Sequence, residues 1–371
     1  MKVIVNSYDL ANAVNKVAKA VATKDINGKI LEGIKLSAKN DSFTLTAYDS
    51  EIGIETNIKC ETIEDGEMVI AGKIFAEYIN KVSNGNADIE ISSQENGQVK
   101  IASGKIKFVV STLNAKDFPI IKQDLTENSF DITVADFKRL VSQTAFCSST
   151  DESRPILKGC LLKVVSGNEL TISAVDGFRL GVAKCKVNNI VGTIDGIVLA
   201  RALIEMTKLV GNEEVVKIYI DKHRIMLKTE DTIFSARLLI GQFVNCANLL
   251  KSPTDKSVVA NREELISTLD RLSILAKTTN NLIAIKAVGN VLQMNANTEI
   301  GNMEEEIEIE KQGSDFMLHL NYKYLLDILK VIPEEQVRIC VNTDQTPILI
   351  RSVDEMANFD YLVMPVRVNR A

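Results

Sequence analysis

Tryptophan is absent from this 371-residue chain, and aromatic residues make up only 5% of it. Proteins that grip single-stranded nucleic acids stack the bases on aromatic side chains, so the composition argues against that class. The two histidines are also sparse for a metal or acid–base site: His223 lies in a polar turn and His319 in an apolar strand pattern. We interpret both as structural residues. The six cysteines show no C-x-x-C spacing, which predicts reduced core thiols in a cytoplasmic protein.

Several other signals are missing. No apolar run is long enough to cross a bilayer, and residues 1–5 lack the apolar core and cleavage site of a signal peptide, so no membrane partner is expected. P-loop, G-x-G-x-x-G and H-E-x-x-H motifs are absent. The acidic run 304–310 alternates with Ile307 and Ile309, as in a strand with one wet face. Asp176 precedes a glycine, as turn residues do. We therefore expect no catalytic residue, metal site or cofactor.

An internal repeat of about 125 residues organises the chain. Each copy begins with a short apolar strand, a polar turn and an amphipathic helix. Leu10, Phe137 and Leu265 hold the same place in these helices and are 127 and 128 residues apart. A second strand with its helix recurs at 68–79, 197–206 and 316–329. A closing strand recurs at 108–113, 234–239 and 361–365.

Between the helices, polar and apolar residues alternate with the period of two that is typical of strands, and turn dipeptides such as Asn96-Gly97 and Asn84-Gly85 separate them. Each copy thus predicts two helices and about eight strands. The fold class is α+β, with three tandem domains in which helices pack on antiparallel sheets. The predicted domains are 1–123 (N-terminal), 124–252 (central) and 253–371 (C-terminal).

The charge is unevenly distributed between helices and strands. The net charge of −6 has the wrong sign for a nucleic-acid-binding protein. The six predicted helices nevertheless sum to +5, which leaves −11 for the rest of the chain. A mildly basic set of helices could follow phosphates without reading bases, although solvated lysines on any helix would give the same count. The helices counted are 7–21, 73–82, 135–148, 200–211, 261–277 and 322–330.

Three short motifs point to a family. Residues 111–119 read STLNAKDFP, residues 175–180 read VDGFRL and residues 363–367 read VMPVR. With the threefold repeat, they make the whole chain resemble the beta subunit of the bacterial replicative DNA polymerase III, the sliding clamp family. The resemblance implies a head-to-tail homodimer that forms a ring around duplex DNA and keeps the polymerase on its template. Members do no chemistry themselves, although they are grouped with DNA-directed DNA polymerases through their complex.

In this family the helices line the hole of the ring. The resemblance therefore suggests DNA contacts from the helix residues Lys81, Lys138, Arg139, Arg201 and Lys208, and from Lys24 and Arg154 in loops. The loop 23–29, however, departs from the usual Arg-Pro sequence, which puts the role of Lys24 in doubt.

The family also binds partner peptides, from the polymerase alpha subunit and the clamp loader, in a groove between the second and third domains. Such peptides bring a glutamine and an apolar-aromatic tail. One wall would comprise Leu157, Val175, Gly177, Phe178, Arg179, Leu180 and Val244. The other would comprise Asn321, Tyr324, Leu362, Val363, Met364, Pro365, Val366 and Arg367. Met364 and the aliphatic residues would form an adaptable apolar pocket, and Arg179 and Arg367 would offer donors at its rim.

Some positions depart from the family pattern, and two other functions stay open. Val244-Asn245-Cys246 stands where Pro-Asp-Tyr is usual, Asn248 replaces a basic residue and Asn280 an aromatic one, and residues 369–371 extend past the usual end. These changes leave the shape of the glutamine-binding part open. A protein scaffold without DNA in its hole would fit the repeat equally well. A metal-dependent nuclease would need clustered carboxylates, and none stands out.

Overall fold

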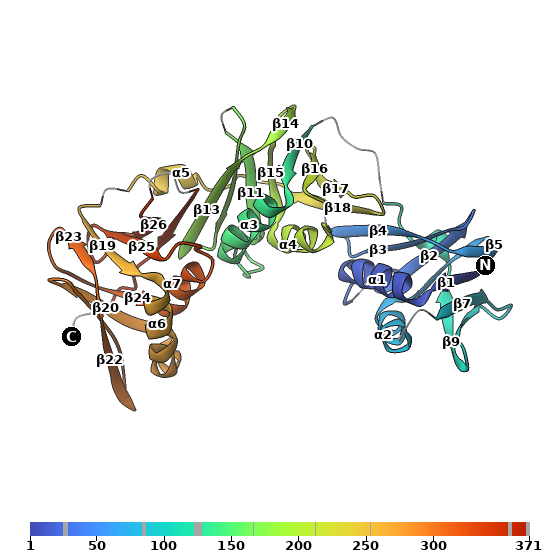
Figure 1. Ribbon diagram of the computed structural model, residues 1–371, viewed down its shortest axis with the longest axis horizontal. Helices are drawn as coiled ribbons and strands as arrows, with labels where there is room; N and C mark the ends of the chain where they lie inside the picture. The colour runs from blue at the N-terminus through green and yellow to red at the C-terminus, as the bar shows by residue number, and fades with distance from the viewer. Residues whose placement is uncertain are drawn as a thin grey trace. The chain divides into compact units, whose positions relative to one another are not determined.

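The computed structural model describes residues 1–24, 29–83, 87–121, 128–165, 167–211, 213–252, 254–354 and 358–368. It divides into two compact units. Figure 1 labels helices and strands of both units. The first comprises residues 1–134, 189–192 and 205–238, and the second comprises residues 135–188, 193–204 and 239–371. The dipeptide Asn84-Gly85, most of the loop 23–29 and the extension 369–371 lie outside the described residues.

The first unit contains two antiparallel sheets that share β9. One runs in the order β5-β1-β7-β8-β9 and the other in the order β10-β16-β17-β18-β4-β3-β2-β6-β9. The strands are β1 (Lys2–Asn6), β2 (Gly33–Lys39), β3 (Ser42–Tyr48), β4 (Ile52–Lys59), β5 (Glu61–Glu64), β6 (Gly66–Ala71), β7 (Asp88–Ser93), β8 (Gln98–Ser103), β9 (Ile106–Leu113), β10 (Ser129–Thr133), β16 (Val215–Ile220), β17 (Arg224–Lys228) and β18 (Thr232–Leu239).

The second unit also contains two antiparallel sheets, which are separate from each other. One sheet has the order β15-β11-β12-β13-β27-β26-β25-β19-β23 and the other has the order β22-β21-β20-β24. The strands are β11 (Gly159–Val164), β12 (Glu169–Val175), β13 (Arg179–Lys186), β15 (Asp195–Leu199), β19 (Lys256–Asn261), β20 (Leu282–Val288), β21 (Val291–Thr298), β22 (Gly301–Glu308), β23 (Glu310–Gln312), β24 (Phe316–Asn321), β25 (Gln336–Val341), β26 (Ile348–Ser352) and β27 (Phe359–Val363). β14 (Asn188–Val191) crosses the boundary between the units.

All six predicted helices form, and the prediction of three tandem α+β copies is confirmed. They are α1 (Ser7–Val17), α2 (Gly72–Val82), α3 (Val134–Thr144), α4 (Ala200–Leu209), α6 (Arg262–Ala276) and α7 (Tyr322–Leu329). The one-turn helix α5 (Cys246–Leu249) was not predicted. Within the part of the chain that the structure describes, no helix combines the length and the apolar character that a membrane crossing needs.

Helices and sheets meet through apolar stripes. In α1, Leu10, Val14 and Val17 are fully buried and face β3 and β4, while α2 packs beside α1. In the second unit, α6 packs in the same way beside α7 and against β21. The acidic run forms two strands, β22 and β23, which are separated by the buried Ile309. The predicted half-buried strand is therefore confirmed, but it forms two strands instead of one.

Candidate functional sites

The predicted partner groove is centred on the pairing of β13 with β27. These strands run antiparallel, with Leu180 opposite Leu362 and Arg179 opposite Val363. The pairing gathers residues that lie far apart in the chain into one apolar cluster within the second unit. Its buried members are Val175, Leu180, Cys246, Cys340, Leu349 and Leu362, and Leu157, Val182, Phe243, Leu250 and Met364 pack against them half-buried.

A tight turn places the aromatic residue of the groove. The Asp176 carboxylate accepts hydrogen bonds from the backbone N–H groups of Phe178 (2.8 Å) and Arg179 (2.9 Å), which confirms Asp176 as a turn residue. Gly177 supplies the left-handed backbone, with φ +98°, that such a turn requires. The turn leaves the Phe178 ring 58% exposed and stacked on Tyr324, at 6.2 Å between centroids.

The Arg179 guanidinium is committed to internal partners. It donates from Nε to Asp176 (3.0 Å), from Nη1 to Asp327 on α7 (2.7 Å) and from Nη2 to the carbonyl of Phe146 (2.7 Å). Its side chain is only 12% exposed and lies over the ring of Tyr324, 4.9 Å from the centroid. Arg179 therefore ties the β13 turn to α7, and its role as a donor at the groove rim stays a prediction.

The remaining groove residues differ in what they expose. Asn321 caps α7, because its Oδ1 accepts from the backbone N–H of Lys323 (3.0 Å). Val363 is fully buried, as plain core would be. The backbone N–H of Met364 donates to the backbone carbonyl of Phe178 (2.7 Å), and the backbone N–H of Val366 donates to the backbone carbonyl of His319 (2.8 Å). Pro365 is partly accessible, and Val244, Val366 and Arg367 are exposed, so these four remain available to a ligand.

Two cysteines belong to the buried apolar cluster. Cys246 stands where the family usually has a tyrosine, and its burial raises the pKa of the thiol to about 11. Burial likewise raises the pKa of Cys340. Both thiols therefore stay protonated near neutral pH and act as small apolar residues. The described residues contain no group of three or more His, Cys, Asp or Glu side chains placed to hold a metal ion.

A polar pocket of about 410 Å³ lies next to the Phe178–Tyr324 pair. Arg154, one of the predicted DNA contacts, is 57% exposed there, and its nearest carboxylate, Asp151, is 3.8 Å away. The other lining residues are Ser148, Ser149, Thr150, Asp151, Asp176, Phe178, Arg179, Lys323 and Tyr324. Arg154 therefore lies beside the predicted groove, and its contact with DNA stays a prediction.

Most of the predicted DNA-contacting cations in the helices have a carboxylate beside them. Lys81 lies 2.8 Å from Glu77, Arg139 lies 2.7 Å from Asp136 and Lys208 lies 2.8 Å from Glu205. Arg139 is the most enclosed of these cations, since it also donates to Gln143 and to the carbonyl of Lys184. The other predicted contacts, Lys24, Lys138 and Arg201, are exposed.

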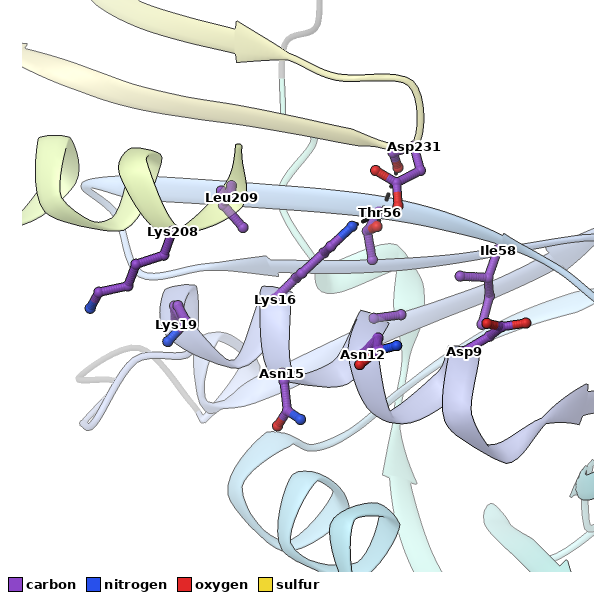
Figure 2. Close-up of a pocket in the computed structure, with 11 residues that line it drawn as sticks. Asp9, Asn12, Asn15, Lys16, Lys19, Thr56, Ile58, Lys208, Leu209 and Asp231 are labelled. Atoms are coloured by element: carbon purple, nitrogen blue, oxygen red, sulfur yellow. Dashed lines mark hydrogen bonds and ion pairs between the residues drawn. The ribbon is translucent and has the colours of Figure 1, made fainter. Parts of the chain in front are cut away.

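Sequence reasoning missed a pocket of about 390 Å³ in the first unit (Figure 2). It lies between α1, β4, the end of α4 and the turn before β18. Lys16 reaches across it and donates to Asp231 (2.6 Å), as Figure 2 shows. The only sequence signal was the lysine spacing on the first helix. The lining residues are Asp9, Asn12, Ala13, Asn15, Lys16, Lys19, Thr56, Ile58, Lys208, Leu209 and Asp231.

Family comparisons cover almost the whole chain. Residues 1–122 match the N-terminal domain of the DNA polymerase III beta subunit, residues 131–245 its central domain and residues 248–367 its C-terminal domain. The beta sliding clamp of Bacillus subtilis is 30% identical, over 99% of this chain and 100% of that protein. The beta sliding clamp of Staphylococcus aureus is 29% identical, over 91% and 92%.

Solved structures agree with these matches. The crystal structure of the DNA polymerase sliding clamp from Bacillus subtilis superposes with a TM-score of 0.93, at 28% identity over 99% of both chains. The DNA polymerase III subunit beta from Pseudomonas aeruginosa gives a TM-score of 0.90, at 26% identity over 99% of this chain and 100% of that one.

Proposed function

Because the chain belongs to the family of DNA polymerase III beta subunits, the bacterial sliding clamps, we propose that two copies close head to tail around duplex DNA. The protein is a DNA sliding clamp, a processivity factor that performs no chemistry of its own. Its proposed compartment is the cytoplasm, and its proposed domains remain 1–123, 124–252 and 253–371.

The repeated use of one strand pairing supports the closed dimer. The fourth strand of the first copy, β4, pairs with the last strand of the second copy, β18. The fourth strand of the second copy, β13, pairs with the last strand of the third copy, β27. Two strands are left without a pairing of this kind among the described strands: β22, the fourth strand of the third copy, and β9, the last strand of the first copy. In a second copy of the chain these two strands would complete the series, head to tail.

Both strands are suited to such a contact. β22 is an edge strand in its sheet, and an edge presents unpaired backbone groups that favour addition of another strand. β9 exposes Ile106 and Val109, each more than half accessible. Lys107 on β9 is exposed, as is Glu304 on β22, so the two surfaces have opposite charge.

Topological binding separates a clamp from a scaffold. A closed ring should be retained on a circular plasmid and should slide off the same plasmid once it is linearised, because retention depends on enclosure and not on affinity. The measurement is co-elution of labelled protein with DNA on a sizing column, after loading by a cognate clamp loader. Equal retention on both DNA forms would favour simple surface binding, and retention on neither would favour the scaffold.

The apolar cluster beside β13 and β27 is the proposed docking site for partner peptides from the polymerase alpha subunit and the clamp loader. Met364 and Leu157 are half-buried there, so they are open to an apolar tail, while the Phe178 ring extends the surface toward Tyr324. A short peptide with glutamine and leucine should bind this cluster. The single observation that carries the proposal is the joining of both predicted walls by one strand pairing.

A charge placed in the cluster should abolish docking. Met364→Asp would put a carboxylate against an apolar peptide tail, and we expect at least a tenfold loss of affinity in fluorescence polarisation. Met317→Asp is the matched control, because Met317 is 49% exposed on β24 and is not part of the cluster. No response of the unmodified protein to the peptide would refute the docking site.

A further inference from the structure

The turn that carries Phe178 is held through its backbone on both sides. The Phe178 N–H donates to the Asp176 carboxylate (2.8 Å), and the Phe178 carbonyl accepts from the backbone N–H of Met364 (2.7 Å). The ring itself is 58% exposed and stacks on Tyr324. Because an exposed ring has few packing contacts to fix it, its direction depends on the backbone of the turn.

The carboxylate that shapes this turn is paired with Arg179. Asp176 Oδ1 accepts both backbone N–H groups of the turn, those of Phe178 and Arg179, whereas its Oδ2 accepts from Nε of Arg179 (3.0 Å). The Asp176 side chain is only 13% exposed, and a charge that is largely buried needs a partner of opposite charge. The turn therefore depends on the position of the Arg179 guanidinium.

Asp327 on α7 fixes the other end of the same guanidinium. Arg179 Nη1 donates to Asp327 Oδ2 at 2.7 Å, a shorter distance than the one from Nε to Asp176. Burial pushes the pKa of Arg179 down, but the hydrogen bond to Asp327 and the nearby negative charges raise it overall. The guanidinium also lies over two rings, 5.2 Å from the centroid of Phe146 and 4.9 Å from that of Tyr324. A planar fork held in this way has one orientation left.

We infer that Asp327 is a positioning residue for partner peptides: by fixing Arg179, it sets the direction in which the turn presents the Phe178 ring. The inference rests on the proposed docking of peptides at the apolar cluster. It gives α7, a helix of the third copy, control over a turn of the second copy. A ring that is already oriented loses less freedom when a peptide binds, so the affinity should depend on Asp327 even without a direct contact.

A double-mutant cycle tests the inference. Its four proteins are the unmodified chain, Asp327→Ala, Phe178→Ala and the variant with both changes, and the measurement is fluorescence polarisation of a labelled peptide with glutamine and leucine. Asp327→Ala should weaken binding about 3- to 30-fold, because Arg179 loses the partner that orients it. In the Phe178→Ala background the same change should weaken binding less than about twofold, since the ring on which it acts is gone.

The matched control is Asp270→Ala, which removes a carboxylate beside the far end of α7. Asp270 lies 3.9 Å from Lys330, the residue directly after that helix, and its loss should change the affinity less than about twofold. The urea midpoint of each variant is measured as well. A purely structural role of Asp327 would lower the midpoint but leave the affinity of the folded protein unchanged, and that result would overturn the inference.

Equal losses of affinity in the two backgrounds would also overturn it, because Asp327 would then act independently of Phe178. If Asp327→Ala does not fold, Asp327→Asn takes its place in the cycle, with a loss of more than about twofold expected only where Phe178 is present. No binding of the peptide by the unmodified protein would count against the proposed docking site itself.

Discussion

Single residues show how burial controls thiol chemistry in this chain. All six cysteines are free, and five of them are buried. Burial disfavours the charged thiolate, so it raises the pKa of both Cys160 and Cys185 to about 12. Cys60 on the loop before β5 is the half-exposed exception, although burial raises its pKa as well.

A thiol reagent should therefore distinguish Cys60 from the rest. With Ellman's reagent at pH 8 we expect one fast equivalent from the native protein, because the thiolate is the reactive species and the other five are protonated and shielded. Cys60→Ser should remove that equivalent, and all six thiols should react in guanidinium chloride. Fast labelling of Cys246 in the native protein would contradict the buried groove wall.

The contacts of Arg179 lead to a prediction about stability. Arg179→Lys keeps the charge but cannot reach Asp176, Asp327 and the Phe146 carbonyl together, so we expect a loss of about 1.5 to 3 kcal/mol in the free energy of unfolding. Urea denaturation measures it. The control Arg367→Lys changes an exposed arginine and should stay within about 0.5 kcal/mol. Equal effects would mean that the guanidinium fork contributes nothing.

Among the elements, asparagine recurs where a strand turns into a helix. Asn6, Asn261 and Asn321 each accept a backbone N–H from the first turn of α1, α6 and α7. Such a cap satisfies a donor that the helix itself leaves unpaired. The cap therefore recurs at the first helix of the first and third copies, whereas α2, the counterpart of α7, follows Ala71 without a side-chain cap.

Loss of a cap should be measurable. Asn261→Ala should lower the free energy of unfolding by about 0.5 to 2 kcal/mol, because the N–H of Glu264 loses its acceptor. Asn261→Ser, which can still accept that bond, should cost little, and urea denaturation of both variants makes the comparison. An identical loss in both would point to a role other than capping.

The helices and most strands were predictable because their signals are local: a cap, an apolar stripe and a turn. The one-turn helix α5 was missed because four residues are too few to show a period. The partners of Arg179 and Lys16 could not be predicted, because Asp327 and Asp231 are 148 and 215 residues away in the chain. The groove residues were identified by resemblance, whereas the pocket beside Lys16 had no motif to reveal it.

At the scale of the whole molecule, the register of the two internal strand pairings makes the proposed dimer testable. Where β4 pairs with β18, the first residue of β4, Ile52, lies opposite the fifth residue of β18, Ala236. Where β13 pairs with β27, the first residue of β13, Arg179, likewise lies opposite the fifth residue of β27, Val363. Applied to β22 and β9, this register sets Glu304 opposite Lys107 of a second copy.

Charge reversal should test that register. Lys107→Glu would place like charges across the strands and should shift the protein toward monomer in sedimentation analysis. Adding Glu304→Lys should restore the dimer, because the pair is then reversed. Glu299→Lys, which lies in the turn before β22, is a control that should not rescue it. A dimer unaffected by Lys107→Glu would exclude this register.

In the proposed dimer, the strand pairing repeated inside the chain would give each copy a donor strand, β22, and an acceptor strand, β9. A molecule with such ends has no natural stopping point, so its copies must either join in a circle or grow without limit. Whether they do one or the other depends on the rotation built into each joint, so the twist of the paired sheet decides between a closed particle and an open fibre.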